Sequence, residues 1–147
     1  MRYLITFVIL SLSLSFSACT SLESTAEESA FQTMMDVHDE IMPKMGEVNQ
    51  LSRQLKGLSA ATDTTKRELM GEIDNAVRSL ESADQDMMAW MNVNGGNKLE
   101  QLQKEKTHDE TMAYILDEEE KIIKIKEDIE NSIQQAQNVL EKVEVSQ

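Results

Sequence analysis

The sequence predicts an all-α protein, an elongated up-down three-helix bundle with coiled-coil character, preceded by a cleaved signal peptide. Apolar residues recur every three or four positions in three long stretches, the spacing that buries one face of a helix. Five Gly, one Pro and 4% aromatic residues disfavour a β-sandwich or barrel, which needs many turns and β-forming residues. Each stretch also follows a Ser or Thr with Glu three residues later, the capping-box pattern of a helix start. These pairs are Thr25–Glu28, Thr65–Glu68 and Thr107–Glu110.

The first eighteen residues, MRYLITFVILSLSLSFSA, have the pattern of an export signal. Arg2 gives a positive start, and the apolar stretch that follows is too short to span a bilayer. The sequence FSAC, from Phe16 to Cys19, resembles the lipobox of bacterial lipoproteins, with Phe16 in place of the usual Leu. This resemblance implies that residues 1–18 are removed and that Cys19 is lipidated. The alternative is an ordinary secretory peptide with an incidental Cys.

A lipidated Cys19 would hold the protein at a membrane without a transmembrane helix. Each buried methylene contributes about 0.8 kcal/mol, and two or three acyl chains (palmitate in type) give a stable anchor. Thr20 stands where an inner-membrane retention signal would place Asp, so by analogy we expect the outer membrane of the cell envelope. Residues 19–25 then form a lipidated tether to a bundle over 26–147. Whether the bundle faces the periplasm or the exterior is left open.

The first predicted helix covers residues 26–58 and contains a proline. Pro43 removes one backbone hydrogen bond and disfavours helical geometry at Met42. We expect a kink around residues 39–46, with a break into two helices as the alternative. The apolar positions of this helix are Phe31, Met34, His38, Ile41, Met45, Val48 and Leu55.

The other predicted helices cover residues 66–92 and 108–144. A short polar link at 59–65 predicts an antiparallel hairpin of the first two helices. The sequence from Asn94 to Asn97, NGGN, predicts a helix stop, with room for a helical turn through Leu99 and Leu102. The acidic run from Glu118 to Glu120 is expected to be a solvated face. The apolar positions are Leu69, Ile73, Ala76, Leu80, Ala83, Met87 and Trp90 in one helix, and Met112, Ile115, Ile122, Ile125, Ile129, Ile133, Ala136, Leu140 and Val143 in the other.

Charge and motif content narrow the function classes. A net charge of −13 disfavours a nucleic-acid binder, which needs a basic surface to displace counterions. The one Cys excludes an intramolecular disulfide and a multi-Cys zinc site. The two His occur in no HExxH pattern, and GxSxG and P-loop patterns are absent from the sequence. We therefore expect no enzymatic activity.

Methionine is the unusual component, with ten in the chain. In a hairpin turning near residue 62, His38 would face about residue 86 and Met34 about Trp90, with His108 and Met112 close by. The simplest interpretation is packing, since Met is a flexible gap-filler for an irregular, kinked core. No cofactor follows from that interpretation. The clustered methionines are Met34, Met35, Met42, Met45, Met87, Met88, Met91 and Met112.

A second interpretation makes the same cluster a metal site. Soft thioethers and an imidazole select Cu(I). The ligands would be Met34, His38, Met42 and Met45, with Trp90 nearby to cover the cation. Acidic neighbours of His38, namely Asp36, Asp39 and Glu40, could orient a metal-bound imidazole. Haem held axially by Met and His, and a Met-rich hydrophobic partner surface, are further alternatives.

Two segments carry a further resemblance. The sequences HDEIMPKMG, starting at His38, and MMAWM, starting at Met87, resemble those of small uncharacterised helical lipoproteins of Bacteroidota, some labelled "viral A-type inclusion protein". The resemblance implies a recurring Met/His/Trp end and transfers no binding residues. We expect a lipid-anchored envelope protein with a structural or protein-interaction role, associating with a protein partner or with itself through its helices. The alternative is a periplasmic Cu(I)- or haem-binding module.

Overall fold

The computed structural model describes the backbone of residues 16–61 and 67–145, and the side chains of residues 22–59 and 67–145. Within these ranges the chain is all-α, as predicted, and no residue forms a strand. It has more helical segments than the three predicted, because the first predicted helix is broken and a short helix precedes the last one. The elements are α2 Phe16–Ile41, the 3-10 helix η1 Met42–Lys44, α3 Met45–Ala61, α4 Arg67–Asn94, α5 Lys98–Glu105 and α6 His108–Val145.

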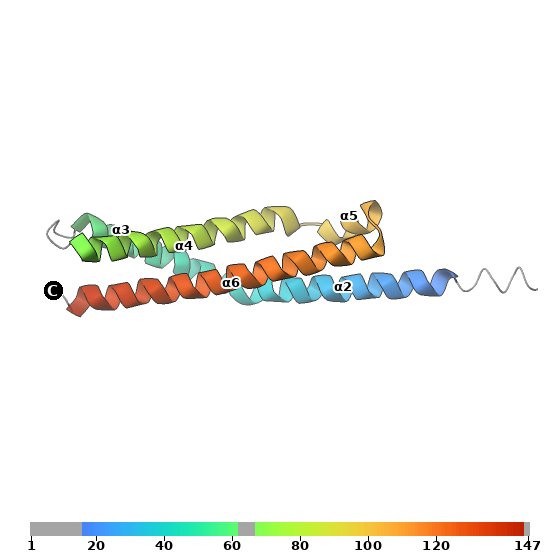
Figure 1. Cartoon of the computed structure of the whole chain (residues 1–147), viewed down its shortest axis with the longest axis horizontal. Coiled ribbons are helices and arrows are strands. Elements are labelled where there is room, and N and C mark those ends of the chain that lie inside the picture. The colour runs from blue at the N-terminus through green and yellow to red at the C-terminus, as the bar shows by residue number, and fades with distance from the viewer. Residues whose placement is uncertain (1–15, 62–66, 146–147) are drawn as a thin grey trace, which may run out of the picture.

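The helices lie along α6, which runs through most of the elongated structure (Figure 1). α2 packs along the first part of α6 in the parallel direction, as the pairs Glu27–His108 and Glu40–Lys126 show. α4 runs antiparallel to both α3 and α6. We call the part built from α2, residues 84–94, α5 and residues 108–126 the α2 half. The part built from α3, residues 67–83 and residues 129–145 is the α3 half.

The break in the first predicted helix lies at Pro43, inside η1. A proline cannot supply the N–H that the helical ladder needs, and its ring crowds the preceding turn. The backbone therefore tightens into one 3-10 turn before α3 resumes at Met45. The expected disturbance at residues 39–46 is confirmed, in the form of two helices and not a simple kink.

The helix boundaries test the three capping boxes. Thr107 and Glu110 form the expected reciprocal pair, since the Thr107 N–H donates to Glu110 Oε2 at 2.9 Å and the Glu110 N–H to Thr107 Oγ1 at 3.4 Å. These bonds from the backbone and hydroxyl of Thr107 lower the pKa of Glu110. Thr65 lies outside the described residues.

The remaining capping box, Thr25 with Glu28, is wrong as a helix start. α2 begins ten residues earlier than predicted, at Phe16, so this pair lies in the helix interior. No Gly or Pro occurs between residues 16 and 42 to stop the helix from extending. The predicted tether region, residues 19–25, is accordingly part of α2.

The predicted stop after the second helix is confirmed. α4 ends at Asn94, and the Gly95 N–H donates to the Met91 carbonyl at 2.9 Å. A Cβ on Gly95 would approach that oxygen to 2.8 Å, and Gly96 has a positive φ of 70°. Both positions therefore need glycine. The chain can then reverse into α5, which realises the helical turn expected around Leu99 and Leu102.

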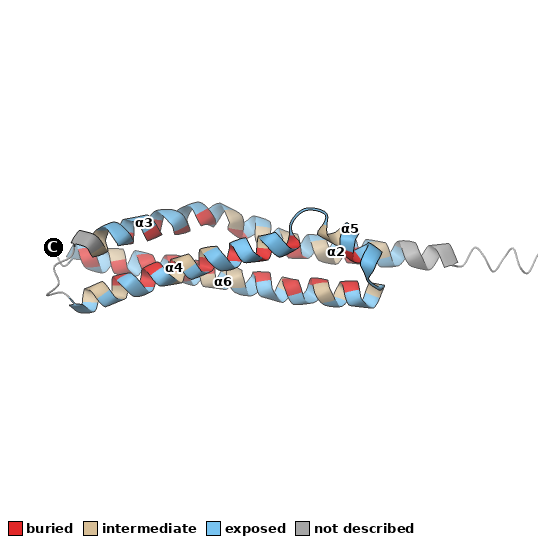
Figure 2. Cartoon of the chain, turned by 90° about the horizontal axis from the view of Figure 1, so that it is seen from above, coloured by how far each residue is buried: buried red, intermediate tan, exposed pale blue. Residues whose placement is uncertain are grey.

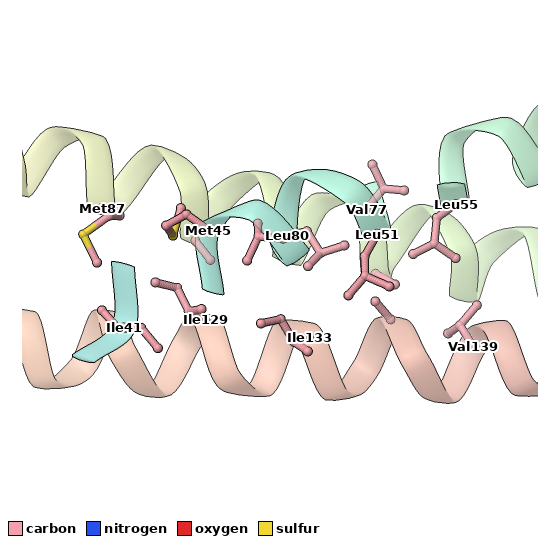
Figure 3. Packing of buried hydrophobic residues seen from close by; sticks show 14 of the residues in the cluster. Ile41, Met45, Leu51, Leu55, Val77, Leu80, Met87, Ile129, Ile133 and Val139 are labelled. Carbon is pink, nitrogen blue, oxygen red and sulfur yellow. The ribbon is translucent and has the colours of Figure 1, made fainter. Parts of the chain in front are cut away.

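Buried residues form one stripe on each long helix, and the stripes face one another (Figure 2). Leu80 of α4 and Ile129 of α6 are fully buried and lie near each other in the interior (Figure 3). Every apolar position predicted for the three stripes is buried or partly buried. The helical periodicity therefore identified most of the core, although the predicted stripes omitted the buried Leu51, Val77 and Val139.

We predict that Leu80→Ala or Ile129→Ala lowers the free energy of unfolding by about 2–5 kcal/mol, because each removes a fully buried branched side chain and leaves a cavity. Urea unfolding followed by circular dichroism measures this change. The exposed Glu120→Gln change is the control and should stay within about 0.5 kcal/mol of the wild type. An unchanged midpoint for Leu80→Ala would contradict the packing described above.

Candidate functional site

Trp90 joins three helices in the α2 half. Its side chain, on α4, stacks on His38 of α2 with ring centroids 5.6 Å apart and planes inclined by 25°. Its indole Nε1–H donates to the backbone carbonyl of Glu118 on α6 at 3.3 Å. The residue is only 5% exposed. Trp90 therefore contacts both helices that flank α4 at this level.

The expected proximity of His38 and Trp90 is confirmed, but the predicted hairpin register is shifted. His38 was predicted to face residue 86, and it stacks on Trp90 one turn further along α4. Asn49 donates to Asp84 in the same hairpin. These contacts place the hairpin centre later in the sequence than residue 62. The shift moves Met34 away from the level predicted for it.

The imidazole of His38 has one acidic neighbour in contact. His38 Nδ1 lies 2.9 Å from Asp39 Oδ1, and the side chain is 14% exposed. The other two acids expected around it are engaged elsewhere, since Asp36 accepts from Gln32 and Glu40 pairs with Lys126. Asp39 is therefore the residue that can fix the orientation of the ring.

The methionines divide between core and surface. Met34 and Met87 are fully buried, and Met45 is nearly so. Figure 3 shows Met45 and Met87 in the same interior space as aliphatic residues of α2 and α6. Met42 is partly buried against this core, whereas Met88 is half-exposed. Most of the cluster therefore packs as ordinary core side chains.

Helix geometry limits which of the predicted ligands could share one ion. Met45 comes eleven residues after Met34, which corresponds to about 16 Å along a helix axis. Their thioethers are too far apart to reach the same ion. His38 lies one turn from Met34 and one turn from Met42, so it can share an ion with either neighbour. In the described part of the chain, no three His, Cys, Asp or Glu side chains are grouped to hold a metal ion.

A buried polar network beside Trp90 was not predicted. Glu118 was expected on a solvated face, but it is 5% exposed, so that expectation is wrong. Asn94 Nδ2 donates to Glu118 Oε2 at 2.7 Å, and Lys121 Nζ donates to Glu118 Oε1 at 2.6 Å. The Tyr114 hydroxyl donates to Asn94 Oδ1 at 2.9 Å. Both oxygens of the buried carboxylate are thus satisfied, and the network connects α4 to α6.

Two ionisable groups in this network have shifted pKa values. Burial raises the pKa of Tyr114, and the nearby negative charge of Glu118 raises it further. Hydrogen bonds to Asp117 and then to Glu118 raise the pKa of Lys121. Lys121 therefore stays protonated, which keeps the donor that the buried Glu118 carboxylate needs.

A second buried carboxylate lies at the outer end of the α2 half. Glu27 of α2 is buried, and its two oxygens lie 2.8 Å from His108 Nδ1 and 2.9 Å from Gln103 Nε2. These contacts tie α2 to α5 and α6. His108 was predicted beside the Met/His cluster, but it is level with Glu27, about 16 Å along α2 from His38. The two imidazoles therefore belong to separate sites.

Sequence periodicity contained a signal for the missed residues. Asn94 follows Trp90 by four positions and so continues the stripe of α4. Glu118 occupies the gap between Ile115 and Ile122 in the stripe of α6. A polar residue at a core position has to find a partner, because an unpaired buried polar group is costly. The stripe therefore marked both positions as buried, although it did not name their partners.

Thr111 is the exception to that pairing. It is fully buried one turn into α6, and its hydroxyl has no hydrogen-bond partner among the described residues. The desolvated hydroxyl weakens the packing of the α2 half locally.

A groove between α4 and α6 lies next to the network. It has a volume of about 530 Å³, with Trp90, Val93 and Ile125 among the apolar lining residues. Lys121 and Lys124 also line it, and both form ion pairs with acids of α6. The groove therefore combines apolar side chains with charged ones, including the carboxylate of Asp86.

No protein-family model, curated protein or solved structure matches the chain. None of the helices in the described residues is long and apolar enough to cross a membrane. The predicted lipidation site, Cys19, lies within the bounds of α2, and its side chain is outside those described.

We predict that Asn94→Ala destabilises the protein by about 1–3 kcal/mol, because the Glu118 carboxylate loses a donor and the Tyr114 hydroxyl loses its acceptor. Thermal unfolding monitored by circular dichroism measures the change. The matched control is Asn92→Ala, an exposed substitution on the same helix, which should have a much smaller effect. Equal effects of the two substitutions would show that the network adds no stability.

Proposed function

We propose that the protein is a lipid-anchored component of the cell envelope that acts as a structural or protein-interaction module and carries out no catalysis. The observation that carries this proposal is the sequence FSAC, which ends in the only Cys of the chain, behind an export signal. Residues 1–18 would be removed, and the acylated Cys19 would attach the protein to the outer membrane. The body would be an up-down bundle of three rods, with α2 and α3 together forming the first.

The position of Cys19 in the fold supports this arrangement. α2 includes residue 19 and continues without a break to Ile41. Residue 19 therefore lies on the same helix that packs against α6 in the α2 half. An anchor at that position would place the α2 half next to the membrane and direct the α3 half away from it. α6, with 38 residues, is about 57 Å long, so the bundle could project well beyond the lipid headgroups.

The surface charge supports a protein partner over a nucleic acid. Lys44, Lys126 and Lys142 pair with acids of neighbouring helices. These ion pairs neutralise some of the basic side chains. The chain has only 14 basic residues against 27 acidic ones, so the remaining surface is acidic. The excess of carboxylates repels phosphate backbones and favours partners with basic or neutral surfaces.

We predict that cells fed an alkyne analogue of palmitate incorporate it into this protein through Cys19. Labelled wild-type protein should be visible after conjugation to a fluorophore and gel electrophoresis, and Cys19→Ala should lose the signal. An unlabelled wild type would rule out the anchor. Ser21→Ala, two residues away and outside the lipobox, is the matched control and should label normally.

A second candidate function is a Cu(I) site at His38. The observation that favours it is the stacking of His38 on Trp90, which puts an imidazole and a cation-binding ring together beside a partly buried thioether, Met42. By helix geometry, His38 and Met42 form the ligand pair that needs the least disturbance of the core.

We predict, for this second candidate, that Cu(I) quenches the fluorescence of Trp90, the one tryptophan of the chain, in protein lacking residues 1–19. His38→Ala or Met42→Leu should abolish the quenching. The matched control Met88→Leu changes a half-exposed methionine on the same helix as Trp90 and should leave it intact. Under the packing interpretation Cu(I) has no effect, and Met42→Leu costs less than about 1.5 kcal/mol of stability.

A further inference from the structure

α2 is held mainly by α6, with a smaller contact to α5. It packs along α6 and touches α4 at few positions, one of which is the stack of His38 on Trp90. α3, in contrast, packs against α4 and also against α6. The attachment of α2 therefore depends largely on its pairing with α6, whereas the three helices of the α3 half all pack against one another.

The α2 half also contains the costly buried groups. Glu27, Asn94, Thr111 and Glu118 are buried there, and the Thr111 hydroxyl is unpaired. In the rest of the described core the buried polar side chains are Ser52 and Ser132, which are small. Glu27 is the one of these groups that belongs to α2, and water can replace its hydrogen bonds to His108 and Gln103 when α2 leaves. Asn94 and Glu118 join α4 to α6 and stay paired when α2 moves.

A joint lies between the two halves. η1 interrupts the helical ladder at Pro43, directly between α2 and α3. A short break of this kind absorbs a change of direction without unfolding the helix on either side. α2 can therefore move as one rigid arm while the α3 half stays folded.

We propose that α2 is an exchangeable arm, which swings about η1 and docks on α4 and α6 of a second copy of this chain, so that two copies associate by exchanging their α2 helices. This deepens the interaction role proposed above and rests on it. The docking surface is the face of α4 and α6 that α2 covers, including Trp90, His108 and Lys126.

Complementarity identifies the occupant of this surface. His108 and Gln103 require a buried carboxylate, which α2 supplies as Glu27. Lys126 pairs with an acid of α2, Glu40. Met34 and Ile41, seven residues apart, fill the apolar part and are fully buried. The helix that fits is acidic and amphipathic, and α2 of a second copy meets every requirement.

Charge favours exchange over association of intact surfaces. Two copies with a net charge of −13 each repel one another across any ordinary surface contact. Exchange of α2 re-forms the contacts already present in one copy and brings no new acidic surfaces together outside the joint. Attachment of both copies to one membrane would raise their effective concentration.

The test uses cross-linking between two differently tagged chains, residues 19–147, each with Cys19→Ser and one new cysteine. One chain carries Glu40→Cys and the other Lys126→Cys, which replaces an ion pair between α2 and α6. A short bis-maleimide then joins positions 40 and 126 only between copies. We expect this product to form after the two chains are mixed and incubated.

A matched pair in the α3 half provides the control. Glu72→Cys and Lys142→Cys, placed on separate chains, replace an ion pair between α4 and α6 that exchange of α2 leaves within each copy. This pair should give little cross-linking. Absence of the 40–126 product would overturn the proposal. Equal yields from the two cysteine pairs would also overturn it, because they would indicate random collision or general unfolding of the chains.

A second variant tests whether release of α2 limits the rate of exchange. Glu27→Gln removes the carboxylate charge that pairs α2 with His108 and Gln103, and should speed formation of the 40–126 product about tenfold. An unchanged rate would show that opening of the α2 half does not limit exchange, and would overturn the mechanism. Palmitate-analogue labelling of Cys19 is unaffected by either result, so failure of exchange is distinguishable from failure of the anchor.

Discussion

The burial of Trp90 determines much of the arrangement of the α2 half. An indole N–H inside a protein needs an acceptor, and the Glu118 carbonyl supplies it. This bond fixes α4 against α6 at a level that places Asn94, one turn after Trp90, next to the Glu118 carboxylate. The carboxylate in turn holds Lys121. The ring also stacks on the imidazole of His38, so one side chain sets the relative position of three helices.

The two halves of the bundle are stabilised by different means. In the α3 half, aliphatic side chains from three helices interlock, and burial of apolar area is the main favourable contribution (Figure 3). In the α2 half, specific hydrogen bonds to Glu27 and Glu118 replace part of that packing. Such bonds add little net stability but define which residues face each other. The α2 half therefore has a well-defined arrangement, and the break at Pro43 leaves α2 separate from α3.

Local signals in the sequence predicted what depends on local interactions. The period of the apolar residues located Leu80 and Ile129 in the core, Thr107 with Glu110 marked a helix start, and Pro43 marked the break. The network around Glu118 depends on the register between helices far apart in sequence, and an estimated hairpin centre is too imprecise to pair Asn94 with it. Thr25 failed for a related reason, because its pattern also occurs inside a helix that nothing stops.

The methionines serve both the packing around the 3-10 turn η1 and the candidate Cu(I) site at His38. A 3-10 turn changes the direction of the chain, so side chains on either side of η1 no longer follow the regular spacing of a straight helix. An unbranched thioether fills such irregular space better than a branched side chain does. Met34 and Met87 are fully buried, so ligation by either would remove it from the core. Met42, within η1 and only partly buried, could bind a soft ion without opening the core, so packing and ligation fall to different members of the cluster.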